Sequence, residues 1–139
     1  MLILASTILL IIASGSAAFG LRYLFAKEYL FYHAQLTGLE WSEIPLRYQA
    51  VILGMLKMVG AGMLAFAVAL AWLVLPLSRG EQWAIWAIFS VVAIHGFISI
   101  YVTIILRRVN PGAKTNVASA CTGVVLSLGA LGLACISHV

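Results

Sequence analysis

His95 is the side chain of this sequence with the most evident capacity for chemistry, because it is an ionisable residue inside a long apolar segment. It lies twelve residues from Trp83 and twelve from Arg107, near the middle of residues 82–106. If this segment is a helix, Ser99 lies one turn further along the same face. Ionisable residues at the centre of a membrane-spanning helix are rare and face the bundle interior. His95 and Ser99 are therefore candidate functional residues.

Two interpretations of His95 are open. In the first, the imidazole is part of a proton relay or contacts a substrate. In the second, it is a neutral structural residue that hydrogen-bonds to hydroxyls or carbonyls of a neighbouring helix, with Ser127 at a comparable depth. The apolar segments contain no acidic residue, and His33 and His138 fall near opposite ends of the predicted fold. The structural interpretation of His95 is therefore favoured. A haem held by two histidines is not expected, because no two histidines are predicted at the same depth in the membrane.

A second group of polar residues surrounds the start of the second apolar segment. Lys57 borders this segment, where its long side chain can reach the membrane surface. If Lys57 instead faces the protein interior, it needs an acidic partner, and Glu28 lies at a comparable level. A Glu28–Lys57 ion pair, joined by His33 and Glu40, would then line a vestibule on the cytoplasmic side.

No residue pattern typical of an enzyme is present. The sequence has no phosphate-binding loop, no metal-ligand spacing and no Ser-His-Asp order. Cys121 and Cys135 are fourteen residues apart, which is about 21 Å along a helix, whereas a disulfide needs Cα atoms within about 7 Å. We predict no catalytic residue, no metal site and no bound cofactor.

The elements that position these residues follow from composition. The chain has 139 residues, of which 64% are hydrophobic and 9% are charged. An average soluble domain is about 25% charged, so the composition excludes a soluble domain, a disordered chain and a nucleic-acid-binding module. The charged residues leave four charge-free stretches: 1–21, 58–78, 82–106 and 115–139. Since about 20 apolar residues cross a bilayer as a helix, each stretch predicts one transmembrane helix.

We predict an all-α membrane protein, a single domain in which four transmembrane helices form an antiparallel up-down bundle. The helices are expected at about residues 2–36, 43–77, 82–107 and 115–138. Residues 22–36 lack Gly and Pro, so helix 1 should extend into the cytoplasm and stop at Thr37-Gly38. The first segment is interpreted as a retained helix rather than a signal peptide, because no Lys or Arg precedes its apolar run.

One face of the second helix carries small residues. Gly54, Ala61 and Ala65 recur at helical spacing with charged residues at the start of the same stripe. Small residues let a second helix approach closely. This face is therefore predicted to pack against another helix.

Basic residues are distributed unequally between the two ends of the predicted bundle. The end with both termini carries only Arg79, whereas the other end carries Arg22, Lys27, Arg47, Arg107, Arg108 and Lys114. The positive-inside rule then predicts a protein of the bacterial inner (plasma) membrane with both termini outside. Anionic lipid headgroups are the natural partners of the cytoplasmic end.

Three functional hypotheses follow. The leading one is a non-enzymatic scaffold or accessory subunit, as a homo-oligomer or in a larger membrane complex, because catalytic groups are lacking. The alternative is a small oligomeric transporter or channel with His95 and Lys57 on its path. The third is a membrane enzyme that acts on a lipid or quinone at the cytoplasmic aromatic residues, in a groove lined by His33, Glu40 and Trp41.

Overall fold

The computed structural model describes residues 1–113, 115 and 117–137, and all regular elements in this part of the chain are helical. Four helices are long and apolar enough to cross a membrane: α1 (Leu2–Leu24), α3 (Leu46–Ser78), α4 (Gln82–Val109) and α5 (Val117–Ile136). Two short helices, α2 (Phe31–Thr37) and η1 (Trp41–Glu43), lie between α1 and α3. The predicted all-α fold with four transmembrane helices is confirmed.

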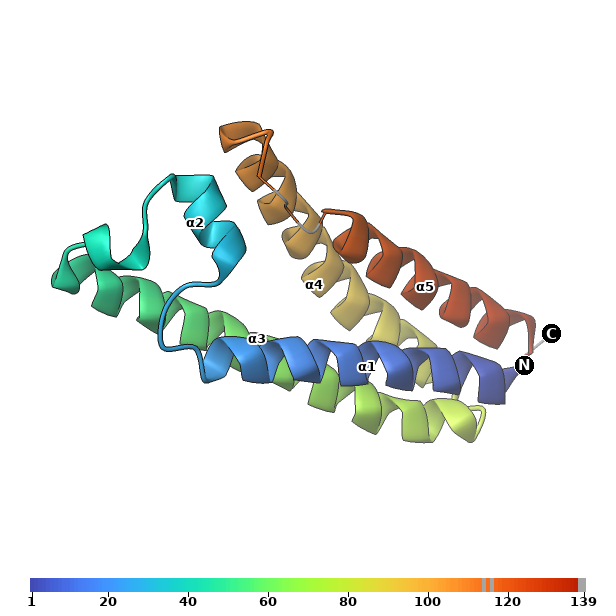
Figure 1. The fold of residues 1–139 in the computed structure, drawn as a ribbon. Helices are drawn as coiled ribbons and strands as arrows, with labels where there is room; N and C mark the ends of the chain where they lie inside the picture. The colour runs from blue at the N-terminus through green and yellow to red at the C-terminus, as the bar shows by residue number, and fades with distance from the viewer. Residues whose placement is uncertain (114, 116, 138–139) are drawn as a thin grey trace.

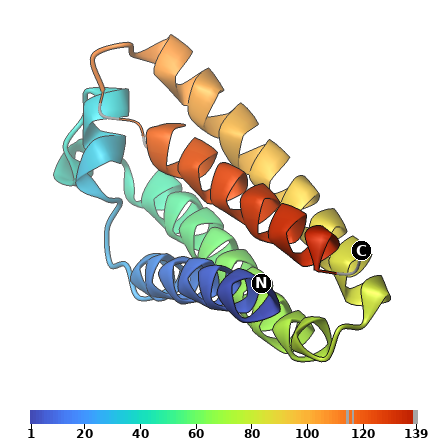
Figure 2. The same ribbon diagram turned by 90° about the vertical axis from the view of Figure 1, so that its right-hand side faces the viewer.

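The four long helices are arranged as two pairs, which also contact each other through α1 and α5 and through α3 and α4. α1 packs mainly on α3, and α4 packs mainly on α5, while successive long helices run antiparallel. The N-terminus, the end of α5 and the turn between α3 and α4 lie at one end of the bundle, and α2 lies at the other end (Figures 1 and 2). The two pairs diverge toward the α2 end (Figure 1). The bundle is therefore closed at the end with the N-terminus and open at the other.

The buried residues explain this shape. The main core lies where all four helices meet, in the half of the bundle nearest the N-terminus, and its largest fully buried apolar side chains are Leu9, Leu70, Leu77 and Ile88. A separate, smaller core joins the end of α1 and the α1–α3 connection to α3, around Tyr29, Ile44 and Leu56. No buried core of described residues joins the two pairs at the open end.

Two glycines bring α1 and α3 into backbone contact. A Cβ atom built on Gly60 would lie 2.7 Å from the Gly20 carbonyl oxygen, and one on Gly20 would lie 2.9 Å from the Gly60 carbonyl oxygen. Nearby, the Ser16 hydroxyl donates a hydrogen bond to the Met63 carbonyl oxygen at 3.1 Å. Small residues thus set the separation of this helix pair, as they do in many membrane proteins.

The extension of helix 1 to residue 36 was predicted wrongly. α1 ends at Leu24, and the chain leaves the helix before it forms the separate α2. The reason is tertiary: Tyr29 turns back to bury its ring, packs edge-on against Trp41 and donates a hydrogen bond to the Leu39 carbonyl oxygen. Such contacts override helix propensity. The predicted stop at Thr37-Gly38 is confirmed, because Gly38 ends α2 in the left-handed region with φ of 69°.

The start of the second transmembrane helix also differs from the prediction. α3 begins at Leu46, with Pro45 in an extended conformation before it, rather than at residue 43. Glu43 belongs to η1, where its carboxylate accepts a hydrogen bond from the Glu40 backbone at 2.7 Å. The other bounds differ by two residues at most within the described chain, which is the ordinary uncertainty of a helix end.

Candidate functional site

His95 lies on α4 where this helix contacts α3. Its ring stacks on Phe66, with ring centroids 4.1 Å apart and an interplanar angle of 17°. The predicted hydrogen-bond partners were wrong, because His95 makes no hydrogen bond among the described residues. The hydroxyl of Ser127 instead donates to the Gly123 carbonyl oxygen of its own helix at 2.8 Å. The imidazole thus meets α3 through its flat face.

Ser99 does not form a hydrogen-bonded chain with His95. It is half-buried one turn along α4, and its carbonyl oxygen accepts a hydrogen bond from the Thr103 hydroxyl at 2.9 Å. That hydroxyl also lies 3.0 Å from the Ile100 carbonyl oxygen. The hydrogen bonds near His95 therefore stay within single helices in the part of the chain that the structure describes.

Of the two interpretations of Lys57, the Glu28–Lys57 ion pair is contradicted, whereas the exposed position at the border of the apolar segment agrees with the structure. Both side chains are exposed, and no ion pair joins any two described residues. Lys57 is exposed on α3, whereas its neighbours Leu56 and Gly60 are buried against α1 and its connection. Glu40 is likewise exposed. The polar residues that were expected to line one vestibule are thus distributed over separate surfaces.

His33 belongs to an aromatic cluster that we define as Tyr23, Tyr29, Tyr32, His33 and Trp41. The ring of His33 lies 4.0 Å from that of Tyr32 and about 6 Å from those of Tyr23 and Tyr29, between ring centroids. Its Nδ1 accepts a hydrogen bond from the Leu30 backbone at 3.0 Å. Burial lowers the pKa of His33 below its ordinary value. The neutral ring therefore holds the first turn of α2.

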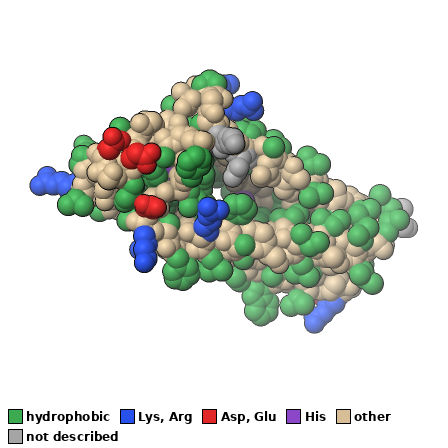
Figure 3. All heavy atoms as spheres, in the orientation of Figure 1, with side chains coloured by type: hydrophobic (Ala, Val, Ile, Leu, Met, Phe, Trp, Pro, Cys, Tyr) green, Lys and Arg blue, Asp and Glu red, His purple; other side chains and the backbone are tan. Residues whose placement is uncertain are grey.

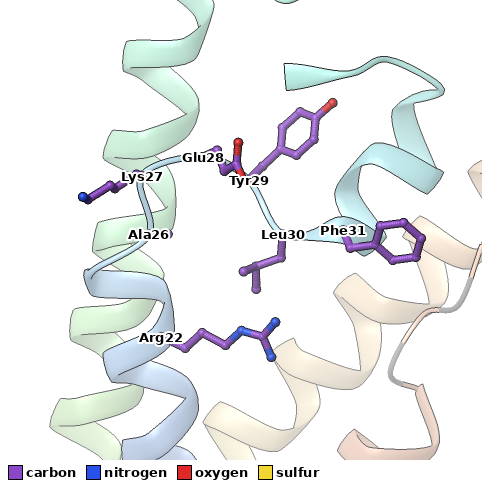
Figure 4. Close-up of a pocket in the computed structure, with 7 residues that line it drawn as sticks. All are labelled: Arg22, Ala26, Lys27, Glu28, Tyr29, Leu30 and Phe31. Carbon is purple, nitrogen blue, oxygen red and sulfur yellow. The ribbon is translucent and has the colours of Figure 1, made fainter. Parts of the chain in front are cut away.

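A recess lies beside the connection between α1 and α2. This recess, which we call the Arg22 cavity, has a volume of about 560 Å³. Its lining residues are Arg22, Ala26, Lys27, Glu28, Tyr29, Leu30 and Phe31. Figure 4 shows the Arg22 side chain leaving α1 toward α4 and α5, with Leu30 above it, while Lys27 points to the opposite side. Figure 3 shows a hollow in this part of the molecule, with a basic side chain at its edge.

Sequence analysis did not predict that Arg22 lines a cavity, and it used this residue only in the charge bias that predicts the orientation. The available signal was its position, because it is the first charged residue of the chain and lies before the end of an apolar helix.

A second recess of about 210 Å³ lies between α2 and α3 and is almost wholly apolar. Neither recess is lined by His95 or Lys57.

The predicted packing face of α3 was assigned to the wrong side of the helix. We define the outer face of α3 as Ala50, Gly54, Lys57, Ala61 and Ala65, all of which are exposed. The buried residues of α3 lie on the opposite side and are Leu56, Gly60, Ala67, Leu70, Val74 and Leu77. Both sides carry small residues at helical spacing, so the spacing alone could not choose between them.

Metal ligation and thiol chemistry receive no structural support in the described residues. These residues contain no group of three or more His, Cys, Asp or Glu side chains that could hold a metal ion. Cys121 and Cys135 are both free. His138 lies outside the described residues.

Comparison with known proteins gives no match, because no family model, no curated protein and no solved structure is significantly similar to this chain. The class of protein therefore follows from the structure itself. Four apolar helices of spanning length define a small multi-pass membrane protein associated with the lipid bilayer.

Proposed function

We propose that the protein is a non-enzymatic scaffold or accessory subunit of a membrane assembly, which it joins through the outer face of α3. The observation that carries this proposal is the exposure of Gly54, Ala61 and Ala65 along one side of a membrane-spanning helix. Small residues are enriched where transmembrane helices contact each other, because they allow close backbone approach. A Cβ atom built on Gly54 would meet nothing within 4 Å, so this side of α3 has room for a partner helix.

The chain itself supplies a comparison for this kind of contact. Gly20 and Gly60 already bring α1 within backbone contact of the opposite side of α3. A partner helix on the outer face would pack in the same way. Its association would be driven by van der Waals contact between the two backbones, because lipid supplies no hydrophobic driving force between helices. Lys57 lies within the outer face, so the partner helix should offer a carboxylate near that level, where the pair would be shielded from water.

The alternative, a small oligomeric transporter or channel, has less support. Such a path should bring His95 and Lys57 toward a common space. His95 stacks on Phe66 between α3 and α4, whereas Lys57 projects from the outer face of α3. The subunit hypothesis requires neither residue to move.

The proposed orientation places both termini outside and the α2 end in the cytoplasm of a bacterial inner membrane. Arg22, Lys27 and Arg47 lie toward the α2 end, as do Arg107 and Arg108 in the last turn of α4. The positive-inside rule favours this end as the cytoplasmic one, where anionic headgroups would be the counter-charge. With both native cysteines replaced by serine, a cysteine at Gly80 should react with an impermeant reagent added outside. Labelling only from the cytoplasm would reverse the orientation.

Site-specific photo-crosslinking tests the subunit hypothesis in native membranes. A photoreactive side chain at Ala61 should form a discrete protein adduct, whereas the same side chain at Ile94, which is exposed on α4, should react mainly with lipid. An adduct of twice the chain mass identifies a second copy, and any other discrete mass identifies a different subunit. The absence of an adduct at Ala61, or equal adducts at both positions, would contradict the proposal.

A further inference from the structure

We infer that the Arg22 cavity is a binding site for an anionic phospholipid, with the lipid phosphate on the Arg22 guanidinium and an acyl chain between α1 and the α4–α5 pair. This site is separate from the outer face of α3 and does not depend on the proposed function.

The first observation is an exposed cation, Arg22, that has no ion-pair partner among the described residues. Arg22 lies in the last turn of α1, two residues before the end of a membrane-spanning helix. Its side chain is directed across the space between the helix pairs rather than away from the bundle (Figure 4). No ion pair joins it to another described residue. Because Arg22 is exposed, its guanidinium is open to contact with an anion.

The second observation is the size and lining of the cavity. Its volume of about 560 Å³ lies within the range of small-molecule sites, about 300–1,000 Å³. The apolar side chains of Leu30 and Phe31 share the cavity with Arg22. Glu28 and Lys27 lie on the connection, at the far end from the Arg22 guanidinium (Figure 4). A charged head beside an apolar wall matches an amphiphile better than a free inorganic ion.

The third observation is the divergence of the helix pairs. The main core ends before the α2 end of the bundle, and α4 and α5 separate there from α1 and α3 (Figure 1). The α2 segment stays attached across this gap, because the Asn110 side chain donates a hydrogen bond to the Gln35 carbonyl oxygen at 2.8 Å. No buried core of described residues joins the two pairs at this end, and in a bilayer the apolar surface that is left exposed is covered by acyl chains. The phosphate of the same lipid lies at the level where α1 ends.

Phosphate recognition by Arg22 has a defined chemical basis. A guanidinium donates two parallel N–H bonds to phosphate oxygens, and such charge-assisted bonds are roughly twice as strong as neutral ones. Lysine supplies charge without the planar fork. Arg22→Lys should therefore bind the lipid more weakly than the parent and more tightly than Arg22→Gln.

The test uses the purified full-length chain in a mild detergent and measures binding by native mass spectrometry. The probes are dioctanoyl phosphatidylglycerol, dioctanoyl phosphatidylcholine and inorganic phosphate. Arg22→Gln should weaken phosphatidylglycerol binding by about tenfold or more, because it removes the charge-assisted hydrogen bonds to the phosphate. The matched control Arg47→Gln removes a cation that is exposed like Arg22 but lies outside the cavity, and it should leave binding within about twofold. The parent should prefer phosphatidylglycerol to the other two probes.

Several results would overturn the inference. Equal losses in Arg22→Gln and Arg47→Gln would show attraction by net charge alone. Inorganic phosphate that competes as well as the lipid would indicate a site for a free anion. If Arg22→Gln fails to fold, as judged by tryptophan fluorescence, unchanged lipid binding in Arg22→Lys would contradict the planar-fork contact. Adduct formation at Ala61 should persist in Arg22→Gln, so the two proposals can fail separately.

Discussion

Replacement of Gly60 by alanine probes the contact that holds α1 on α3. The added methyl group would lie 2.7 Å from the Gly20 carbonyl oxygen and 2.8 Å from the Leu24 backbone nitrogen, whereas ordinary van der Waals contact begins at 3.4 Å. The helices must therefore separate by about 0.7 Å at this level, which is the difference between 3.4 and 2.7 Å. Because both opposing atoms belong to the backbone, no side-chain rotation can relieve the clash.

The expected cost follows from overpacking data. Extra methyl groups in a packed core cost typically about 1–3 kcal/mol. Alanine also favours a helix over glycine by up to about 1 kcal/mol, so a control with the same propensity change is needed. Gly62→Ala is that control, because its methyl group would meet nothing within 4 Å. Relative to Gly62→Ala, the free energy of unfolding of Gly60→Ala should fall by about 1–3 kcal/mol.

The assay is denaturant unfolding in detergent micelles, followed by the fluorescence of the four tryptophans. Gly20→Ala should behave like Gly60→Ala, since its methyl group meets the same crossing at 2.9 Å. If Gly60→Ala unfolds together with Gly62→Ala, α1 and α3 do not cross at these glycines, and the arrangement of the pair must be revised.

Three further predictions concern the aromatic residues. His95→Phe should preserve the stacking on Phe66 and have the same free energy of unfolding as the parent in the micelle assay. His95→Gln should lower that free energy by about 0.5–1.5 kcal/mol. A glutamine variant more stable than the phenylalanine variant would indicate a polar partner of His95. Tyr29→Phe should remove the hydrogen bond to the Leu39 carbonyl oxygen. Hydrogen exchange in residues 30–44 should then become faster, by an amount that corresponds to a loss of about 1 kcal/mol in the free energy of local opening. Unchanged exchange rates would contradict this prediction. Because burial lowers the pKa of His33, α2 should be most stable above about pH 6.5 and lose protection as the pH falls below that value. His33→Gln should flatten this pH profile of hydrogen exchange, and an unchanged profile would assign the effect to another group.

The four membrane spans could be predicted because they depend on composition and length. A helix that crosses a bilayer must satisfy its own backbone hydrogen bonds and must be apolar over about 20 residues. Both requirements are local, so charge-free stretches of the sequence located α1, α3, α4 and α5. The stop at Gly38 was predictable for the same reason, since the left-handed conformation is a local property of glycine.

The features that were missed depend on contacts between distant residues. Residues 25–30 contain good helix formers, yet burial of Tyr29 against Leu56 and Trp41 favours a break there. The choice between the two small-residue sides of α3 depends on where Gly20 meets Gly60, forty residues away. The partner of His95 is an aromatic ring on another helix, which a search for hydroxyl groups could not find.

The mass of the particle that is extracted from native membranes in a mild detergent tests the central claim most directly. A subunit that joins an assembly through the outer face of α3 should emerge in a complex heavier than the 14.9 kDa chain. Ala61→Leu should release the single chain without lowering its own stability, because Ala61 is exposed in the chain, while Ile94→Leu on α4 should leave the complex intact. A parent protein that emerges as a single chain, or an Ala61→Leu complex of unchanged mass, would contradict the account.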